Sequence, residues 1–112
     1  MKQPLTASPS ARLSGRIRVP GDKSISHRAL ILGALSTGTT RIAGLLEAED
    51  VMATARAVAA LGAEVERSNG TVAVKGQGVV GLRAPPAALD FGNSSTGSRL
   101  MLGVVAGHDM QV

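Results

Sequence analysis

The sequence predicts a layered α/β domain, because segments with the pattern of strands alternate with segments with the pattern of helices over its 112 residues. Three observations lead to this class. Alternating or β-branched runs at residues 15–19 and 39–46 each precede a stretch with helical spacing, and an Asn-Gly pair separates two more alternating runs. The expected order is β-α-β-α-β-β, one βαβαββ unit, followed by a further helix. An apolar content of 44% suffices for one modest core.

The amino-terminal segment is predicted to be a flexible arm over residues 1–12, which are rich in Pro, Ser and Thr and show no periodicity. The ordered domain is expected over residues 13–112. In "GRIRV", at residues 15–19, Ile17 and Val19 fall on one side, as they do in a half-buried strand.

The first helix is expected over residues 24–36, where apolar side chains recur near helical spacing. Ser24 is predicted as its N-cap, because a serine hydroxyl accepts a hydrogen bond from an unpaired backbone N–H in the first turn. Gly38 is predicted to mark its end.

The middle of the chain gives the clearest local pattern. Asn69 and Gly70 form the favoured pair for a two-residue type I′ hairpin turn. Gly62 suits the C′ position of the helix before it. The expected elements are a strand at residues 39–46, a helix at 47–62, and strands at 63–68 and 71–75.

The last part of the sequence predicts a third helix, capped by the hydroxyl side chains of Ser94 to Thr96. The final residues, "GHDMQV" at 107–112, resemble the beginning of another strand that has no partner in the sequence. A truncated fragment would look like this. An unpaired strand edge would also favour self-association, because exposed hydrogen-bonding groups seek partners.

Composition excludes several kinds of function. There is no cysteine, and His27 and His108 are not joined by a metal-binding spacing, so no metal site is predicted. No apolar run is long enough for a signal peptide or a membrane span, and a cytoplasmic protein is expected. A net charge of +4 keeps a basic nucleic-acid-binding domain as an alternative. The basic residues are scattered, however, and Phe91 is the one aromatic residue available for base stacking.

The stretch "PGDKSISHR" gathers donors at a predicted helix start. A helix amino end carries unpaired N–H groups and about half a positive charge, so it attracts anions. Lys23, Ser24 and Arg28 would add a point charge, a hydroxyl and a guanidinium fork for a phosphate. A P-loop is rejected, because five residues instead of four separate Gly15 from Gly21. Ordinary solvated residues at a helix end remain the alternative.

A second anion cradle is predicted in "GNSSTGSRL", where Asn93, Ser94, Ser95 and Thr96 precede a helix and Arg99 completes the cradle. The alternative is a well-capped helix after a glycine turn. Acidic residues in "EAED", among them Asp50, are most simply explained by the dipole of the helix that they begin. His27 is interpreted as a packed or solvated helix residue and not as a base.

Four stretches, taken together, narrow the function. "PGDKSISHRALILGAL", "GLLEAEDV", "ALGAEVE" and "LDFGNSSTGSRL", in this order and at these distances, resemble the amino-terminal part of 5-enolpyruvylshikimate-3-phosphate synthase. The resemblance covers roughly residues 13–105. It implies part of a two-domain enolpyruvyl transferase fold, an inside-out α/β barrel in which each domain contains three βαβαββ units. Asp22 and Ser24 distinguish the first block from the sister family that acts on UDP-N-acetylglucosamine.

The resemblance implies transfer of the carboxyvinyl group of phosphoenolpyruvate to the 5-hydroxyl of shikimate 3-phosphate with release of phosphate, a step in aromatic amino acid biosynthesis. No metal and no cofactor are implied. Lys23 would contact both substrates and act in catalysis, Ser24 and Arg28 would bind shikimate 3-phosphate, and Ser95 would lie against phosphoenolpyruvate. Supporting positions are Asp50, Asn93, Thr96 and Arg99.

Departures from the family pattern concern the second cradle. Many members have glycine where Ser95 stands, alanine where Gly97 stands and proline where Leu100 stands. The resemblance is closer to the bacterial branch that tolerates glyphosate, which often has alanine at the position of Ser95. Extra atoms there would narrow the pocket more for a longer inhibitor than for the substrate.

The family enzymes are several times longer than this chain, so the sequence is interpreted as a catalytically incomplete amino-terminal portion. It is expected to need the complementary carboxy-terminal portion for activity. Two alternatives to this interpretation remain. One is a stand-alone module that binds a phosphate ester without turnover, and the other is the basic nucleic-acid-binding domain named above.

Overall fold

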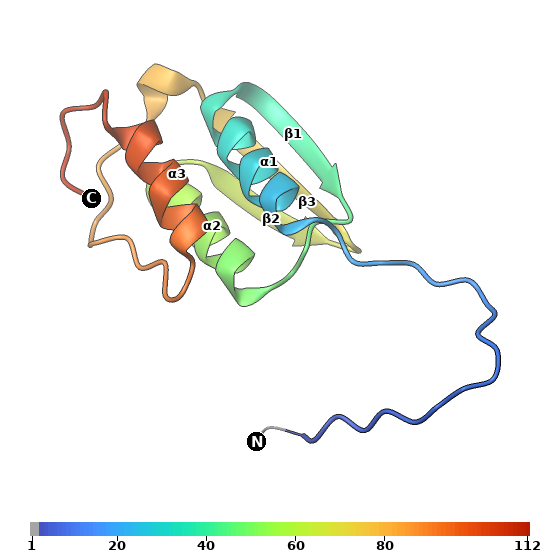
Figure 1. Cartoon of the computed structure of the whole chain (residues 1–112). Helices are drawn as coiled ribbons and strands as arrows, with labels where there is room; N and C mark the ends of the chain where they lie inside the picture. Colours follow the sequence, from blue (N-terminus) through green and yellow to red (C-terminus); the bar gives the residue numbers. More distant parts are fainter. Residues whose placement is uncertain (1–2) are drawn as a thin grey trace.

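The computed structural model describes residues 3–112, in which three helices lie on one face of a small sheet (Figure 1). The elements, in chain order, are α1 (Lys23–Leu35), β1 (Thr37–Ala43), α2 (Glu49–Ala60), β2 (Glu64–Ser68), β3 (Thr71–Gln77), the 3-10 turn η1 (Val79–Gly81) and α3 (Ser95–Val105). Helices α1 and α2 contact the sheet, and α3 packs against both of them. The α/β class predicted from the sequence is therefore confirmed.

The sheet has three strands in the order β1-β3-β2, and both pairings are antiparallel. The central strand β3 places Val74 opposite Thr40 on one side and Val65 on the other. The hairpin prediction is confirmed, because Asn69 and Gly70 have φ angles of 47° and 74°, both in the left-handed region that a type I′ turn requires.

The core lies between the helices and the sheet. Its largest fully buried side chains include Leu30 of α1, Val51 and Val58 of α2, Leu61 and Val74. Each buried side chain of this size contributes roughly 1.5–3 kcal/mol relative to an exposed one. The sequence pattern of α1 and α2 thus produces a continuous apolar layer that fixes α1 against β3 and β1, and α2 against β2.

The predicted strand at residues 15–19 is wrong for this structure. The chain is extended there, but it pairs with no strand among residues 3–112, and Ile17 and Val19 stay 87% and 73% exposed. Alternation alone cannot make a strand, because backbone N–H and C=O groups need a neighbouring strand to pair with. The extended arm therefore continues to the start of α1 (Figure 1), and residues 1 and 2 of the predicted arm lie outside the described residues.

Both predicted boundaries of the first helix are also corrected. The N-cap of α1 is Asp22, whose carboxylate accepts a hydrogen bond of 2.8 Å from Ile25 N, and Ser24 lies inside the first turn. The helix ends at Leu35, three residues before Gly38, which belongs to β1. The first correction arises because serine and aspartate are similarly good N-caps, so the tertiary contacts decide which one is used.

The remaining boundaries agree more closely with the sequence. Gly62 has a φ of +113°, as expected for a C′ glycine after α2. Ser94 caps α3 by accepting a hydrogen bond from Gly97 N. Residues 107–112 form no strand, so the expectation of a further strand there is wrong. None of the helices in residues 3–112 is long and apolar enough to cross a bilayer.

Candidate anion-binding site

The three helices begin at the same end of the molecule. In Figure 1 the first turns of α1, α2 and α3 all lie at the end from which the extended arm leaves. Each first turn presents unpaired N–H groups and a partial positive charge. This end of the fold is consequently favourable for anions.

The first turn of α1 is fixed against the loop between β1 and α2. A Cβ on Gly21 would collide with the carbonyl oxygen of Gly44, so the two backbones are in direct contact. The buried Ser26 hydroxyl accepts a hydrogen bond of 3.0 Å from Leu46 N. The glycine of "PGDKSISHR" is therefore explained by close backbone approach, and the block is rigidly placed.

Lys23 and Asp50 meet where α1 and α2 begin. Lys23 Nζ lies 3.5 Å from Asp50 Oδ2, and the two side chains are 54% and 24% exposed. The ion pair keeps the ammonium group near the amino end of α1 while it stays accessible to solvent. An exposed ion pair of this kind adds little stability, so its main effect is to hold the Lys23 ammonium group in place.

His27 lies directly beneath this ion pair and is fully buried. Its Nδ1 is 2.8 Å from Thr54 Oγ1 in α2, and its Nε2 is 3.9 Å from Asp50 Oδ2. Burial lowers the pKa of His27 below its ordinary value, Asp50 opposes this shift, and the positive charges of Lys23 and Arg28 add to it. The imidazole is accordingly neutral near pH 7.

The amino end of α3 lies beside the start of α2. Gly92, with φ at +52°, and an Asp90 carboxylate that accepts from Gly92 N shape the turn before it. A cavity of about 450 Å³ is lined by Glu49, Asp50, Phe91, Gly92 and Asn93. The two predicted cradles thus meet at Asp50, which pairs with Lys23 and faces the cavity next to Asn93.

The predicted site residues are brought together only in part. Lys23 and Asp50 are in contact, and Asn93 shares the cavity with Asp50. Arg28 lies one turn further along α1, where it lines an apolar groove between α1 and α3. Ser24, Ser95 and Thr96 lie in the first turns of their helices, where Ser24 and Thr96 are half-buried and Ser95 is exposed. Arg99 is exposed in the second turn of α3.

Sequence reasoning missed the buried polar residues of this end, Ser26 and Thr54, and assigned no partner to His27. The interpretation of His27 as a packed residue agrees with its burial. A signal was present in the sequence, because polar residues on the apolar stripe of a helix are costly unless they are paired. The pattern could indicate that a partner was needed but not which one.

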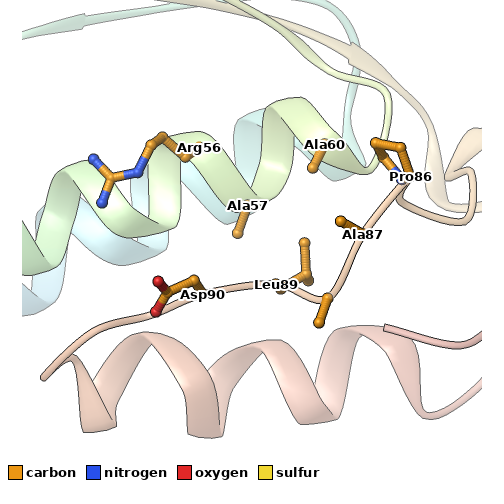
Figure 2. A pocket seen from close by; sticks show the side chains of 8 residues that line it. Arg56, Ala57, Ala60, Pro86, Ala87, Leu89 and Asp90 are labelled. Atoms are coloured by element: carbon orange, nitrogen blue, oxygen red, sulfur yellow. The ribbon is translucent and has the colours of Figure 1, made fainter.

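A second pocket lies away from this end, between α2 and the segment before α3 (Figure 2). It has a volume of about 210 Å³, and its walls are mostly small apolar side chains such as Ala57, Ala60 and Ala87. Figure 2 shows Arg56 and Asp90 at one of its ends, and Arg56 forms an ion pair with Glu49. It offers no cluster of groups for chemistry. Nor do residues 3–112 contain three His, Asp or Glu side chains grouped to hold a metal.

The fold and the site define a class of protein: an α/β unit in which three helix amino ends and the Lys23–Asp50 ion pair lie at one end of the fold. The chain matches, over residues 7–112, the family described as EPSP synthase (3-phosphoshikimate 1-carboxyvinyltransferase), and it belongs to that family.

Named relatives and solved structures agree with this family. The chain is 66% identical over 105 residues to the 3-phosphoshikimate 1-carboxyvinyltransferase of Parvibaculum lavamentivorans, and 67% identical over 105 residues to that of Afipia carboxidovorans. These matches cover 93% of the chain but 23% and 24% of the relatives. An EPSP synthase structure from Acinetobacter baumannii matches 87% of this chain and 23% of its own, with a TM-score of 0.79 and 43% identity. The chain therefore spans about a quarter of the length of its relatives.

Proposed function

We propose that this chain is part of an enzyme that transfers the carboxyvinyl group of phosphoenolpyruvate to the 5-hydroxyl of shikimate 3-phosphate and releases phosphate. Family membership supports the reaction, and the relatives are named for it. The observation that carries the proposal is the common end of the three helices, where Lys23 stands accessible beside Asp50. The chain alone is expected to be inactive, because it spans about a quarter of the relatives' length.

The reaction needs what this end offers. Both substrates carry phosphate, so several negative charges must be held close together while the hydroxyl adds to the enol carbon. Fixed cations and oriented N–H groups stabilise such charge without reorganising during the reaction. Because α1 is fixed by Gly21 and Ser26, its donors are in place before a ligand arrives.

Individual roles follow from the family resemblance and the placement of the side chains. Lys23 contacts both substrates, and Ser24, whose hydroxyl is not needed for the cap that Asp22 supplies, binds shikimate 3-phosphate together with Arg28. Ser95, exposed in the first turn of α3, lies against phosphoenolpyruvate. The supporting positions are Asp50, Asn93, Thr96 and Arg99.

The identity of residue 95 also bears on inhibition. A serine at this position adds atoms where many relatives have glycine, so we propose that it weakens inhibition by glyphosate in the complete enzyme. Ser95→Gly is expected to restore inhibition while turnover with phosphoenolpyruvate is kept. Unchanged inhibition would remove the steric explanation.

A chimera tests the reaction directly. This chain would replace the matching segment of the Parvibaculum lavamentivorans relative, and the product would be assayed for phosphate release from the two substrates. Activity is expected, together with a loss of about a hundredfold or more for Lys23→Ala, because one preorganised charged donor is worth that much. Arg56→Ala, which removes an exposed cation away from Lys23, is the matched control. An inactive chimera that folds normally would contradict the proposal.

The isolated chain should release no phosphate in the same assay. Phosphate release would contradict its dependence on a complementary portion. Saturable binding of shikimate 3-phosphate without turnover would instead favour the stand-alone module. Nucleic-acid binding gains no support here, because Phe91 packs partly buried against the core.

Self-association of the isolated chain is a further proposal. Strands β1 and β2 each pair only with β3 among residues 3–112, so their outer edges are open. Sedimentation should show dimers or larger species as the concentration rises, and a compact monomer at high concentration would contradict this.

A further inference from the structure

Thr54 occupies the point where the three helix amino ends meet. Its hydroxyl lies 2.8 Å from His27 Nδ1 in α1. On the side of α3, a Cβ added to Gly97 would lie 2.7 Å from the same Oγ1 atom. Thr54 is fully buried. A hydroxyl so enclosed has no water to bond with, so its interaction with His27 determines how it is oriented.

The direction of this hydrogen bond can be derived from charge. A neutral imidazole carries one proton, either on Nδ1 or on Nε2. If the proton were on Nδ1, the lone pair of Nε2 would face the negative Asp50 Oδ2 at 3.9 Å, which is repulsive. If the proton is on Nε2, the N–H faces the carboxylate, and Nδ1 accepts from the Thr54 hydroxyl. The second arrangement is favourable at both nitrogens.

Among residues 3–112 the buried Nε2 has no hydrogen-bond partner, and the carboxylate that holds Lys23 lies 3.9 Å from it. Its N–H can therefore fix the carboxylate on the side away from solvent, while Lys23 contacts the same Oδ2 atom from the exposed side. This arrangement requires a glycine at position 97, because a methyl group on Gly97 would clash with Thr54 Oγ1.

We propose that His27 and Thr54 are positioning residues: Thr54 holds the imidazole in the form protonated on Nε2, this N–H orients Asp50, and Asp50 places the Lys23 ammonium for the anion. The importance of Lys23 rests on the proposed function, whereas the proton position and the orientation of Asp50 do not. The arrangement also links the start of α3, at Gly97, to the start of α1, at Lys23.

The full 112-residue chain allows a direct test by NMR. Long-range proton–nitrogen correlation above about pH 7, where a free imidazole is neutral, should show the His27 proton on Nε2. Thr54→Ser keeps the hydroxyl and should keep this signature. Thr54→Val keeps the shape but removes the donor; because Asp50 still faces Nε2, the proton should stay on Nε2, and the ¹⁵N resonance of Nδ1 should shift as its hydrogen bond is lost. A wild-type proton on Nδ1, or an unchanged Nδ1 resonance in Thr54→Val, would overturn the proposal.

The electrostatic contact with Asp50 gives a second signature. Asp50→Asn should lower the pKa of His27 further in an NMR titration, because Asp50 is the group that opposes the effect of burial. Lys23→Met should raise it, since a neighbouring positive charge is removed. If the pKa of His27 moved in neither variant, the imidazole would not sense the ion pair and the proposal would fail.

Binding of inorganic phosphate tests whether Thr54 affects the anion site at Lys23. At low ionic strength, binding by Thr54→Val should be about fivefold weaker than wild type, the factor that corresponds to a hydrogen bond of ordinary strength. Thr54→Ser should bind as wild type does. Equal binding by wild type and Thr54→Val would overturn the link to Lys23. Absence of phosphate binding in the wild type would count against the anion site, whereas the expected imidazole signatures would still support the positioning of Asp50.

Discussion

The amino ends of α1 and α3 are both predicted anion cradles, but the structure holds them in different ways. The start of α1 is tied to other elements by the backbone contact of Gly21 with Gly44 and by the bond from Leu46 N to Ser26. The start of α3 is held by its own cap, in which Ser94 accepts from Gly97 N, and by the packing of Gly97 against the Thr54 side chain, and it borders an open cavity. The comparison indicates one fixed cradle and one that can adjust.

The largest expected effect tests the fixed cradle. Gly21→Ala places a methyl group against the carbonyl of Gly44, where only a backbone shift can relieve the clash. Overpacking of this kind should lower the free energy of unfolding by about 3 kcal/mol, measured by urea denaturation followed by circular dichroism. Gly103→Ala is the matched control, because a Cβ there has open space around it, with no atom of another element of residues 3–112 within 4 Å. Similar stability of the two variants would show that the start of α1 is not held by close contact.

A smaller loss is expected at the adjustable cradle. A Cβ on Gly97 would lie 2.7 to 2.9 Å from Thr54 Oγ1, Ser94 Oγ and Phe91 Cδ1, all of them side-chain atoms that can move. Gly97→Ala should cost about 1–2 kcal/mol in the same denaturation measurement. Combining it with Thr54→Ala removes one of the three contacts, so the double variant should be more stable than the sum of the single losses implies. Simple additivity would contradict the contact between α2 and α3.

The hairpin and the arm show how far the sequence could predict the fold. Both have alternating patterns, yet residues 64–68 and 71–77 form strands and residues 15–19 do not. The turn at Asn69 and Gly70 places the two hairpin strands side by side, so each strand has a partner. The arm has no strand beside it among residues 3–112. Alternation predicts which side chains share a face, and only pairing makes the strand.

The site was predictable to a similar extent. The residue types of "PGDKSISHR" indicated a helix amino end suited to anions, and the structure places Lys23 there beside Asp50. The cap was assigned to Ser24 instead of Asp22, because the two residues are chemically alike in this role. The contact of His27 with Thr54 spans 27 positions in sequence, and no local pattern predicts which helices will cross at a given pair.

The pH dependence of the free energy of unfolding tests the burial of His27 beneath the start of α1. Burial lowers the pKa of His27 in the folded state below the ordinary 6.5, so the unfolded chain binds a proton more readily. The contribution of His27 to stability is therefore full above pH 6.5 and is lost as the pH falls from there through the folded-state pKa. His27→Gln should flatten the decrease in the free energy of unfolding across this window. An unaltered slope would contradict burial of a neutral imidazole.

The smallest expected effect distinguishes the N-cap residues of α1 and α3. Asp22 is exposed and accepts from Ile25 N at 2.8 Å, while Ser94 is buried and accepts from Gly97 N at 3.2 Å. Replacement of either by alanine should cost about 1 kcal/mol. Asp22 carries a charge that also interacts with the dipole of α1, and salt screens this part of its contribution.

Denaturation at low and at about 1 M salt, where the Debye length is near 3 Å, separates the two caps. The cost of Asp22→Ala should shrink at high salt, and the cost of Ser94→Ala should stay constant, since a neutral hydroxyl has no charge to screen. An equal response would mean that the carboxylate of Asp22 acts only as a hydrogen-bond acceptor. In that case the electrostatic difference between the two cradles would have to come from their other charged residues, such as Lys23 and Asp50.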